Sequence, residues 1–127
     1  MTRVILLAAF LVAADYAWPD PKADYLLYCR GCHLADGTSV PPEVPSLHEL
    51  APLLESNTGR EYLIRVPGVS QTPMSDERLA AVLNWVVSEF ISDALPENFK
   101  PFTPAEVGKA RVKVLPDPKR YRAKLHQ

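Results

Sequence analysis

The two cysteines of this 127-residue chain lie together in Cys29-Arg30-Gly31-Cys32-His33, a C-x-x-C-H sequence. Two thiols at this spacing can add across the two vinyl groups of a haem, while the adjacent histidine turns its imidazole onto the iron. The motif therefore predicts one covalently attached haem c, held by Cys29 and Cys32, with His33 as a ligand of the iron.

Two other uses of a C-x-x-C pair are weighed against haem attachment. A structural zinc site needs about four protein ligands, and this chain has no second cysteine pair. A thioredoxin-like dithiol stands in a pattern of alternating strands and helices, whereas a proline-rich loop and helical periods follow Cys32. The surroundings of the motif therefore favour haem attachment.

A short helix is predicted to lead into the motif. Asp20 followed by Pro21 is typical of a helix N-terminus, with an acidic cap and proline in the first helical position. The residues from there to Gly31 carry Tyr25 and other apolar side chains at helix-compatible spacing. The cysteines should lie at the end of this helix.

A rigid loop is predicted after the motif. Residues 34–37 form a turn, and three prolines within 40–45 exclude a helix there. A carbonyl of such a loop can accept a hydrogen bond from the far ring nitrogen of His33 and so fix the ring, and Pro42 and Pro45 are candidates. The alternative is that these are ordinary loop prolines.

The strongest helical pattern runs from Ser75 to about Ile91. Ser75 predicts the N-cap, and two acidic residues follow in the first turn, where the helix dipole favours them. Trp85 lies at the edge of the apolar face and is expected to pack. The face itself repeats at helical spacing through Leu79, Val82, Leu83, Val86, Val87 and Phe90.

A shorter helix is predicted between these two. Thr58 and Glu61 form a capping-box pattern that opens a helix over 62–66. Arg60 and Arg65 are interpreted as surface side chains. The second possibility is contact with haem propionates, since a guanidinium matches the geometry of a carboxylate.

From about residue 25 to residue 90 the chain resembles the class I cytochrome c family. The C-x-x-C-H is the specific part of the likeness, and the order of helix, motif, turn, proline loop, middle helix, Pro-Met pair and closing helix adds to it. The resemblance implies a small all-α haem domain in which His33 binds one face of the iron and a methionine binds the other. It also implies an electron carrier rather than an enzyme.

Met74 is the leading candidate for that methionine. Met1 is the start residue, so Met74 is the one internal thioether; it follows Pro73 and precedes a helix start, where the family tends to place its distal methionine. A thioether beside histidine suits an electron-transfer haem, and the alternative is a flexible core side chain. His48 and, more weakly, His126 remain other candidate ligands, although a lone histidine beside an acidic residue is more often a solvated one.

The N-terminal residues are typical of a secretory signal peptide. A short positive start precedes an apolar run over residues 4–14 that ends in small residues, which predicts a signal peptide over 1–14, with cleavage after Ala17 as the alternative. A spanning helix needs about twenty apolar residues, so we expect no stable membrane span. Because the resemblance implies haem attachment outside the cytoplasmic membrane, we expect the periplasm.

The composition shifts after the closing helix. Residues 93–127 contain five prolines and few apolar residues in helical register, so they are predicted to be a basic extension outside the haem domain over 15–92. Thr103 and Pro104 predict one short helix near 104–112 within it.

Charge divides at the same place. Residues 15–92 carry 11 acidic and 5 basic side chains, net -6, whereas 93–127 carry 4 acidic and 8 basic ones, net +4, with a basic end at 119–124. The extension either folds back onto its own acidic domain or reaches for an acidic partner, and a partly disordered tail is the third possibility. We expect it to serve docking more than stability.

These expectations describe a carrier of single electrons between periplasmic redox proteins. The donor would be a dehydrogenase, for which the family suggests quinoproteins, and the acceptor another cytochrome or a terminal oxidase; nucleic acid is not an expected partner. Two alternatives stay open. One is a haem subunit embedded permanently in a larger redox complex, and the other is a haem protein that binds or senses a small ligand.

Overall fold

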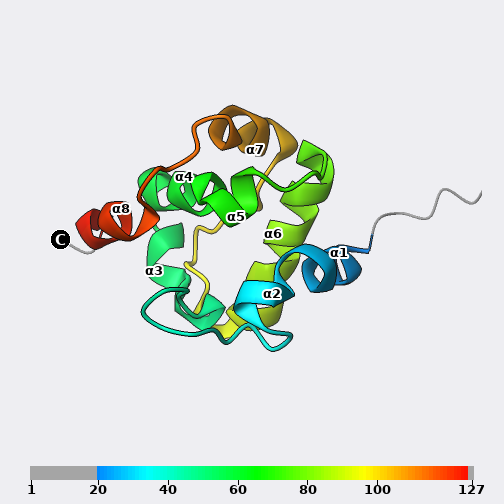
Figure 1. Ribbon diagram of the computed structural model, residues 1–127, viewed down its shortest axis with the longest axis horizontal. Helices are drawn as coiled ribbons and strands as arrows, with labels where there is room; N and C mark the ends of the chain where they lie inside the picture. The colour runs from blue at the N-terminus through cyan, green and yellow to red at the C-terminus, as the bar shows by residue number, and fades with distance from the viewer. Residues whose placement is uncertain (1–19, 126–127) are drawn as a thin grey trace, which may run out of the picture.

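The computed structural model describes residues 20–125, so the predicted signal peptide lies outside the described part. The described residues form helices and no strand, which confirms the all-α fold class. Figure 1 shows a ring of helices, with α1, α2 and α6 on one side and α3, α4 and α8 on the other. Among the described helices, none is long and apolar enough to cross a membrane. The helices are α1 Pro21–Tyr28, α2 Arg30–His33, α3 Ala51–Leu54, α4 Asn57–Arg65, α5 Pro67–Ser70, α6 Asp76–Phe90, α7 Pro104–Arg111 and α8 Pro118–Leu125, with 3-10 turns at Leu47–Glu49 and Ser92–Ala94.

Side-chain caps fix where the longer helices begin. The side chains of Asp20, Ser75 and Thr103 each accept a hydrogen bond from a backbone N–H in the first turn of α1, α6 and α7, as their sequences predict. For α4 the expected cap, Thr58, is wrong. The cap is Ser56, whose hydroxyl accepts from the N–H of the third helical residue and so starts the helix two residues earlier.

Helix α6 is the longest helix of the described residues, and both α1 and α7 pack against it. Its predicted apolar face is confirmed, because Leu79, Val82, Val86 and Val87 are buried and the remaining members of the face pack against them. Helix α1 packs against α6 through Tyr25, whose side chain is fully buried. Burial of one such face contributes about 1.5–3 kcal/mol per large apolar side chain.

An ion pair with a buried carboxylate also joins α1 to the start of α6. The Asp24 carboxylate accepts hydrogen bonds from Nη2 and Nε of Arg78 at 2.5 and 3.1 Å. Asp24 is only 6% exposed. A buried carboxylate without a partner is costly, so this two-point contact specifies how the two helices meet.

The prediction that residues 93–127 lie outside the core is wrong. Phe102, Val107, Ala110 and Leu115 are buried in the same cluster as the side chains of α1 and α6. The amide of Asn84, on α6, donates to the Phe102 carbonyl and accepts from its N–H, at 3.0 and 2.7 Å. The apolar residues of this segment are spread over a helix and two connections, which is why no helical register revealed them.

Two arginines of α4 bind the C-terminal segment and are not the surface side chains that the sequence indicated. The Arg60 guanidinium donates to both carboxylate oxygens of Glu106 at 2.9 Å, and Arg65 donates through Nε to the Lys113 carbonyl at 2.6 Å. Their side chains are only 11% and 18% exposed. They therefore fasten this segment to α4.

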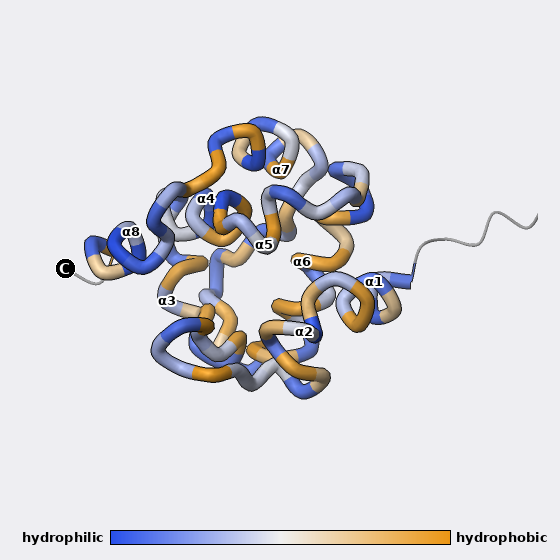
Figure 2. The backbone as a smooth tube through the Cα atoms, in the orientation of Figure 1, coloured by the Kyte–Doolittle hydropathy of each residue, from blue (hydrophilic) through white to orange (hydrophobic). Residues whose placement is uncertain are grey.

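The basic end of the chain forms α8, which the sequence analysis did not predict. Figure 2 shows α8 as largely hydrophilic, and none of its residues is buried. Its Tyr121 ring stacks on that of Tyr62 with centroids 6.0 Å apart. Of the two arrangements that the charges allow, the structure has the segment folded back on its own domain. Two exposed acids pair with it, in the contacts Lys119–Glu43 and Arg122–Glu49.

The core role of the C-terminal segment predicts unequal costs for one substitution at two valines. Val107 is fully buried in α7, whereas Val112, at its C-terminal end, is 75% exposed. Val107→Ala should lower the free energy of unfolding by about 2 kcal/mol, from two lost methyl groups and the cavity left behind. Val112→Ala should change it by less than about 0.5 kcal/mol. Denaturant unfolding of the haem-loaded protein measures both changes in free energy. Equal small effects at the two valines would mean that the C-terminal segment lies outside the core.

Candidate haem site

The C-x-x-C-H comprises Cys29, which is the C-cap of α1, and the four residues of α2. The Cys29 N–H donates to the Tyr25 carbonyl at 2.8 Å, ending α1, and the Cys29 carbonyl accepts from the N–H groups of Cys32 and His33 at 3.1 and 3.0 Å, starting α2. The thiols are free; Cys29 is half-buried and Cys32 is exposed. One turn of helix thus presents both thiols and the imidazole from one short piece of backbone.

The environment of Cys29 does not suit a redox dithiol. Burial raises the pKa of its thiol to about 11, and the nearby Asp24 carboxylate and Cys32 add to the shift. Catalytic dithiols need a lowered pKa, because the thiolate is the nucleophile. Within residues 20–125, moreover, no three His, Cys, Asp or Glu side chains come together in a group that could hold a metal ion, so a zinc site lacks its ligands.

His33 has a ring nitrogen that the protein leaves without a regular hydrogen bond. Its Nδ1 is buried and unpaired. Burial lowers the pKa of His33, and the Pro45 carbonyl, acting as a hydrogen-bond acceptor, opposes this only in part. A neutral imidazole is the form that ligates a metal. Of the two loop prolines that the sequence offered, Pro45 is the one that acts on the ring.

Tyr25 fixes the backbone that carries His33. Its hydroxyl donates to the Leu34 carbonyl at 2.6 Å and approaches the His33 carbonyl at 3.2 Å. Leu34 has a positive φ of 50°, a conformation that favours glycine, so the chain is held there by its surroundings. Burial raises the pKa of Tyr25 to about 12, which keeps the hydroxyl protonated as a donor.

The Tyr25 ring is itself held by two aromatic side chains of α6. Its centroid lies 5.1 Å from that of Trp85 and 5.5 Å from that of Phe90. Trp85 is therefore a packing aromatic, as its position in the sequence indicates. The sequence did not predict that the Tyr25 hydroxyl binds the backbone after the motif. A tyrosine eight residues before His33 indicates only an apolar position of the helix.

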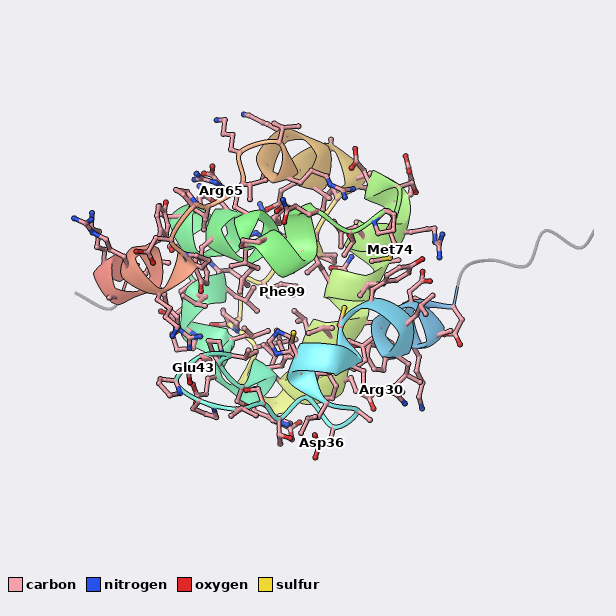
Figure 3. The ribbon with its side chains drawn as sticks, in the orientation of Figure 1. Arg30, Asp36, Glu43, Arg65, Met74 and Phe99 are labelled. Atoms are coloured by element: carbon pink, nitrogen blue, oxygen red, sulfur yellow. The ribbon has the colours of Figure 1, made fainter. Side chains whose placement is uncertain are left out.

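Met74 comes from a different part of the chain. Figure 3 shows it on the connection from α5 to α6, whereas Arg30 marks the C-x-x-C-H helix α2. Its side chain is 4% exposed and belongs to the core cluster. Burial of the thioether fits both interpretations of this residue, as an iron ligand and as a core side chain.

The contacts of His48 argue against it as a ligand of the iron. Both ring nitrogens of His48 face backbone carbonyls, Nδ1 that of Phe90 at 3.1 Å and Nε2 that of Asp36 at 2.9 Å, so neither is left for a metal. The ring ties the loop after the motif to the end of α6. His126 lies outside the described residues.

These observations fit a haem c in three respects. The two thiols are unpaired and close in sequence, the imidazole beside them is half-buried with its Nδ1 enclosed by the protein, and the one described methionine is buried. Thiols, imidazole and thioether together form the donor set of a covalently attached haem with histidine and methionine on the iron.

Comparison with known proteins identifies cytochromes that are similar to this chain. No family model matches the chain. It is similar to a cytochrome c-552 of Thermus thermophilus, with 34% identity over an alignment of 129 positions that covers 86% of this chain and 87% of that protein. A second cytochrome c-552 of Thermus thermophilus is 36% identical over 106 residues, covering 68% of this chain and 81% of that protein.

The hydroxyl of Tyr25 should stabilise the site more than that of a neighbouring tyrosine. Tyr25→Phe keeps the packed ring but leaves two carbonyls without their donor, so the free energy of unfolding should fall by about 1–3 kcal/mol. Tyr28→Phe, at the 36% exposed last residue of the same helix, should cost less than about 0.5 kcal/mol. Denaturant titration of the haem-loaded variants measures both losses of free energy of unfolding. If Tyr25→Phe costs no more than Tyr28→Phe, the Tyr25 hydroxyl does not stabilise the backbone that carries His33.

Proposed function

This chain belongs to the class I c-type cytochromes, and from that premise we propose that it shuttles single electrons in the periplasm from a dehydrogenase to another carrier or a terminal oxidase. As a monohaem c-type cytochrome it carries covalently attached haem c and is an electron carrier. The observation that carries the proposal is the C-x-x-C-H turn, with two free thiols beside an imidazole whose Nδ1 is buried.

The proposed site residues are Cys29 and Cys32 for attachment and His33 and Met74 for the iron. The haem iron supplies the chemistry, since it alternates between the ferric and ferrous states and so holds one electron at a time. The chain supplies attachment and orientation. Tyr25 and the Pro45 carbonyl hold His33, and histidine with methionine raises the reduction potential relative to more basic ligands.

Water exclusion is the other contribution of the chain. The residues around the proposed ligands form one buried cluster that includes Tyr25, Met74 and Leu79. A low-dielectric surrounding with few mobile dipoles tunes the potential of a metal centre and keeps competing ligands away. These properties support a carrier that transfers electrons without transforming a substrate.

The periplasmic location rests on the sequence. The apolar run over residues 4–14 supports export, and it lies outside the described residues. The periplasm is also where a free carrier can meet both an exported dehydrogenase and a membrane-bound acceptor. The class of donor, a dehydrogenase such as a quinoprotein, is part of the proposal.

Covalent attachment is tested by denaturing electrophoresis with a haem peroxidase stain. The haem should travel with the wild-type polypeptide and be absent from the band of the Cys29→Ala/Cys32→Ala variant. Arg30→Ala, which changes an exposed residue between the two cysteines, should keep the stain. Haem that leaves the denatured wild type would contradict the attachment.

The distal ligand is tested by comparing two single variants. Met74→Ala should abolish the weak long-wavelength charge-transfer band of thioether-ligated ferric iron and lower the reduction potential. His48→Ala should leave both unchanged, because the His48 ring is occupied by two carbonyls. The reverse pattern would assign the sixth position to His48.

Binding of carbon monoxide to the reduced protein distinguishes an electron carrier from a haem protein that senses a small ligand. The reduced wild-type protein should keep its spectrum under carbon monoxide, since the proposed ligands His33 and Met74 would leave no position on the iron free. Rapid uptake of carbon monoxide by the wild type would favour the sensing alternative.

A further inference from the structure

The connection that carries Met74 is held by a side chain from the C-terminal segment. Arg111, at the end of α7, donates through Nε to the Ser70 carbonyl at 3.1 Å, through Nη2 to the Thr72 carbonyl at 2.5 Å and through Nη1 to the Met74 carbonyl at 2.8 Å. One guanidinium therefore binds three alternate carbonyls over the five residues that end at Met74.

The same guanidinium also reaches the start of α6. Nη1 donates to the Asp76 carboxylate at 3.1 Å, and the Arg111 side chain is only 15% exposed. Helix α7 approaches closely here, since a Cβ on Gly108 would collide with the other Asp76 oxygen. The backbone on both sides of the Met74 side chain is thus tied to one rigid point.

The geometry requires an arginine. Loop carbonyls lack the helical N–H partners that would otherwise satisfy them, and the planar guanidinium presents five N–H donors in a fixed fork. A lysine ammonium carries the same charge, but its three donors on a flexible stem cannot span carbonyls from Ser70 to Met74 at once. The contact is also buried enough that water competes for these carbonyls only weakly.

We propose that Arg111 is a positioning residue for the sixth iron ligand. Its guanidinium fixes the loop so that the Met74 thioether stays on the iron, and its loss increases the fraction of molecules in which that position is open. The inference rests on the proposed function in taking Met74 as the ligand. It makes the C-terminal segment part of the haem site, although no residue of that segment is a proposed ligand.

Arg60 provides a matched control. It also joins the C-terminal segment to the rest of the domain, through two bonds to Glu106 at 2.9 Å and one to the Lys100 carbonyl at 2.8 Å, and its side chain is 11% exposed. These bonds all end on the C-terminal segment itself rather than on the connection that carries Met74. Loss of Arg60 should therefore destabilise the fold without acting on the iron.

The experiment compares haem-loaded full-length Arg111→Gln, Arg111→Lys, Arg60→Gln and Met74→Ala with the wild type, at a temperature where each is folded. The readouts are the intensity of the charge-transfer band in the oxidised state and the rate of carbon monoxide uptake in the reduced state. Arg111→Gln should weaken the band and speed uptake by about tenfold or more, because local opening exposes the sixth position. Arg111→Lys should lie between it and the wild type.

The controls separate the possible failures. Arg60→Gln should lower the melting temperature but keep the band and an uptake rate within about twofold of the wild type. If both arginine-to-glutamine variants speed uptake alike, or if Arg111→Gln keeps the wild-type band and rate, Arg111 has no specific effect on the ligand and the inference is wrong. An unchanged band in Met74→Ala would instead overturn the ligand assignment itself. Should Arg111→Gln fail to fold, Arg111→Lys decides by the same criteria.

Discussion

The packing of α1 against α6, with Tyr25 fully buried between them, is the contact on which the rest of this structure depends. The Tyr25 ring sits against Trp85 and Phe90, and its hydroxyl reaches past the helix to the carbonyls that follow the C-x-x-C-H. An ion pair between the buried Asp24 carboxylate and Arg78 fixes the same two helices at the beginning of α6. The helix contact and the orientation of His33 are therefore one structural unit, because the same side chain makes both.

The connection that carries Met74, the proposed second ligand, is held by the C-terminal segment. A domain that ended at α6 would bury little surface, and small domains are marginally stable for that reason. Here Phe102, Val107 and Leu115 extend the core, while arginines of α4 and α7 bind the segment to the middle of the chain. The opposite charges of the two parts serve this internal attachment. Its exposed ion pairs add little to stability by themselves, so apolar burial is the main contribution.

Local features of the site and fold could be predicted from the sequence, and long-range ones could not. The C-x-x-C-H, the caps at Asp20, Ser75 and Thr103 and the apolar face of α6 depend on residues a few positions apart. The place of the C-terminal segment depends on contacts between residues about 20 to 50 positions apart, such as Arg65 with Lys113, which no period in the sequence records. Ser56 and Thr58 show the limit at short range, because either hydroxyl could have capped α4.

The central claim is that Met74 completes a closed coordination shell with His33, and it is tested most directly by proton NMR of the reduced protein with 13C-methyl-labelled methionine. A methyl group directly over a haem experiences a large ring-current shift, because it lies in the shielding cone of the macrocycle. We predict one methionine methyl resonance far upfield of the normal methyl range, absent in Met74→Leu. A Met74 methyl resonance at an ordinary shift would contradict the account.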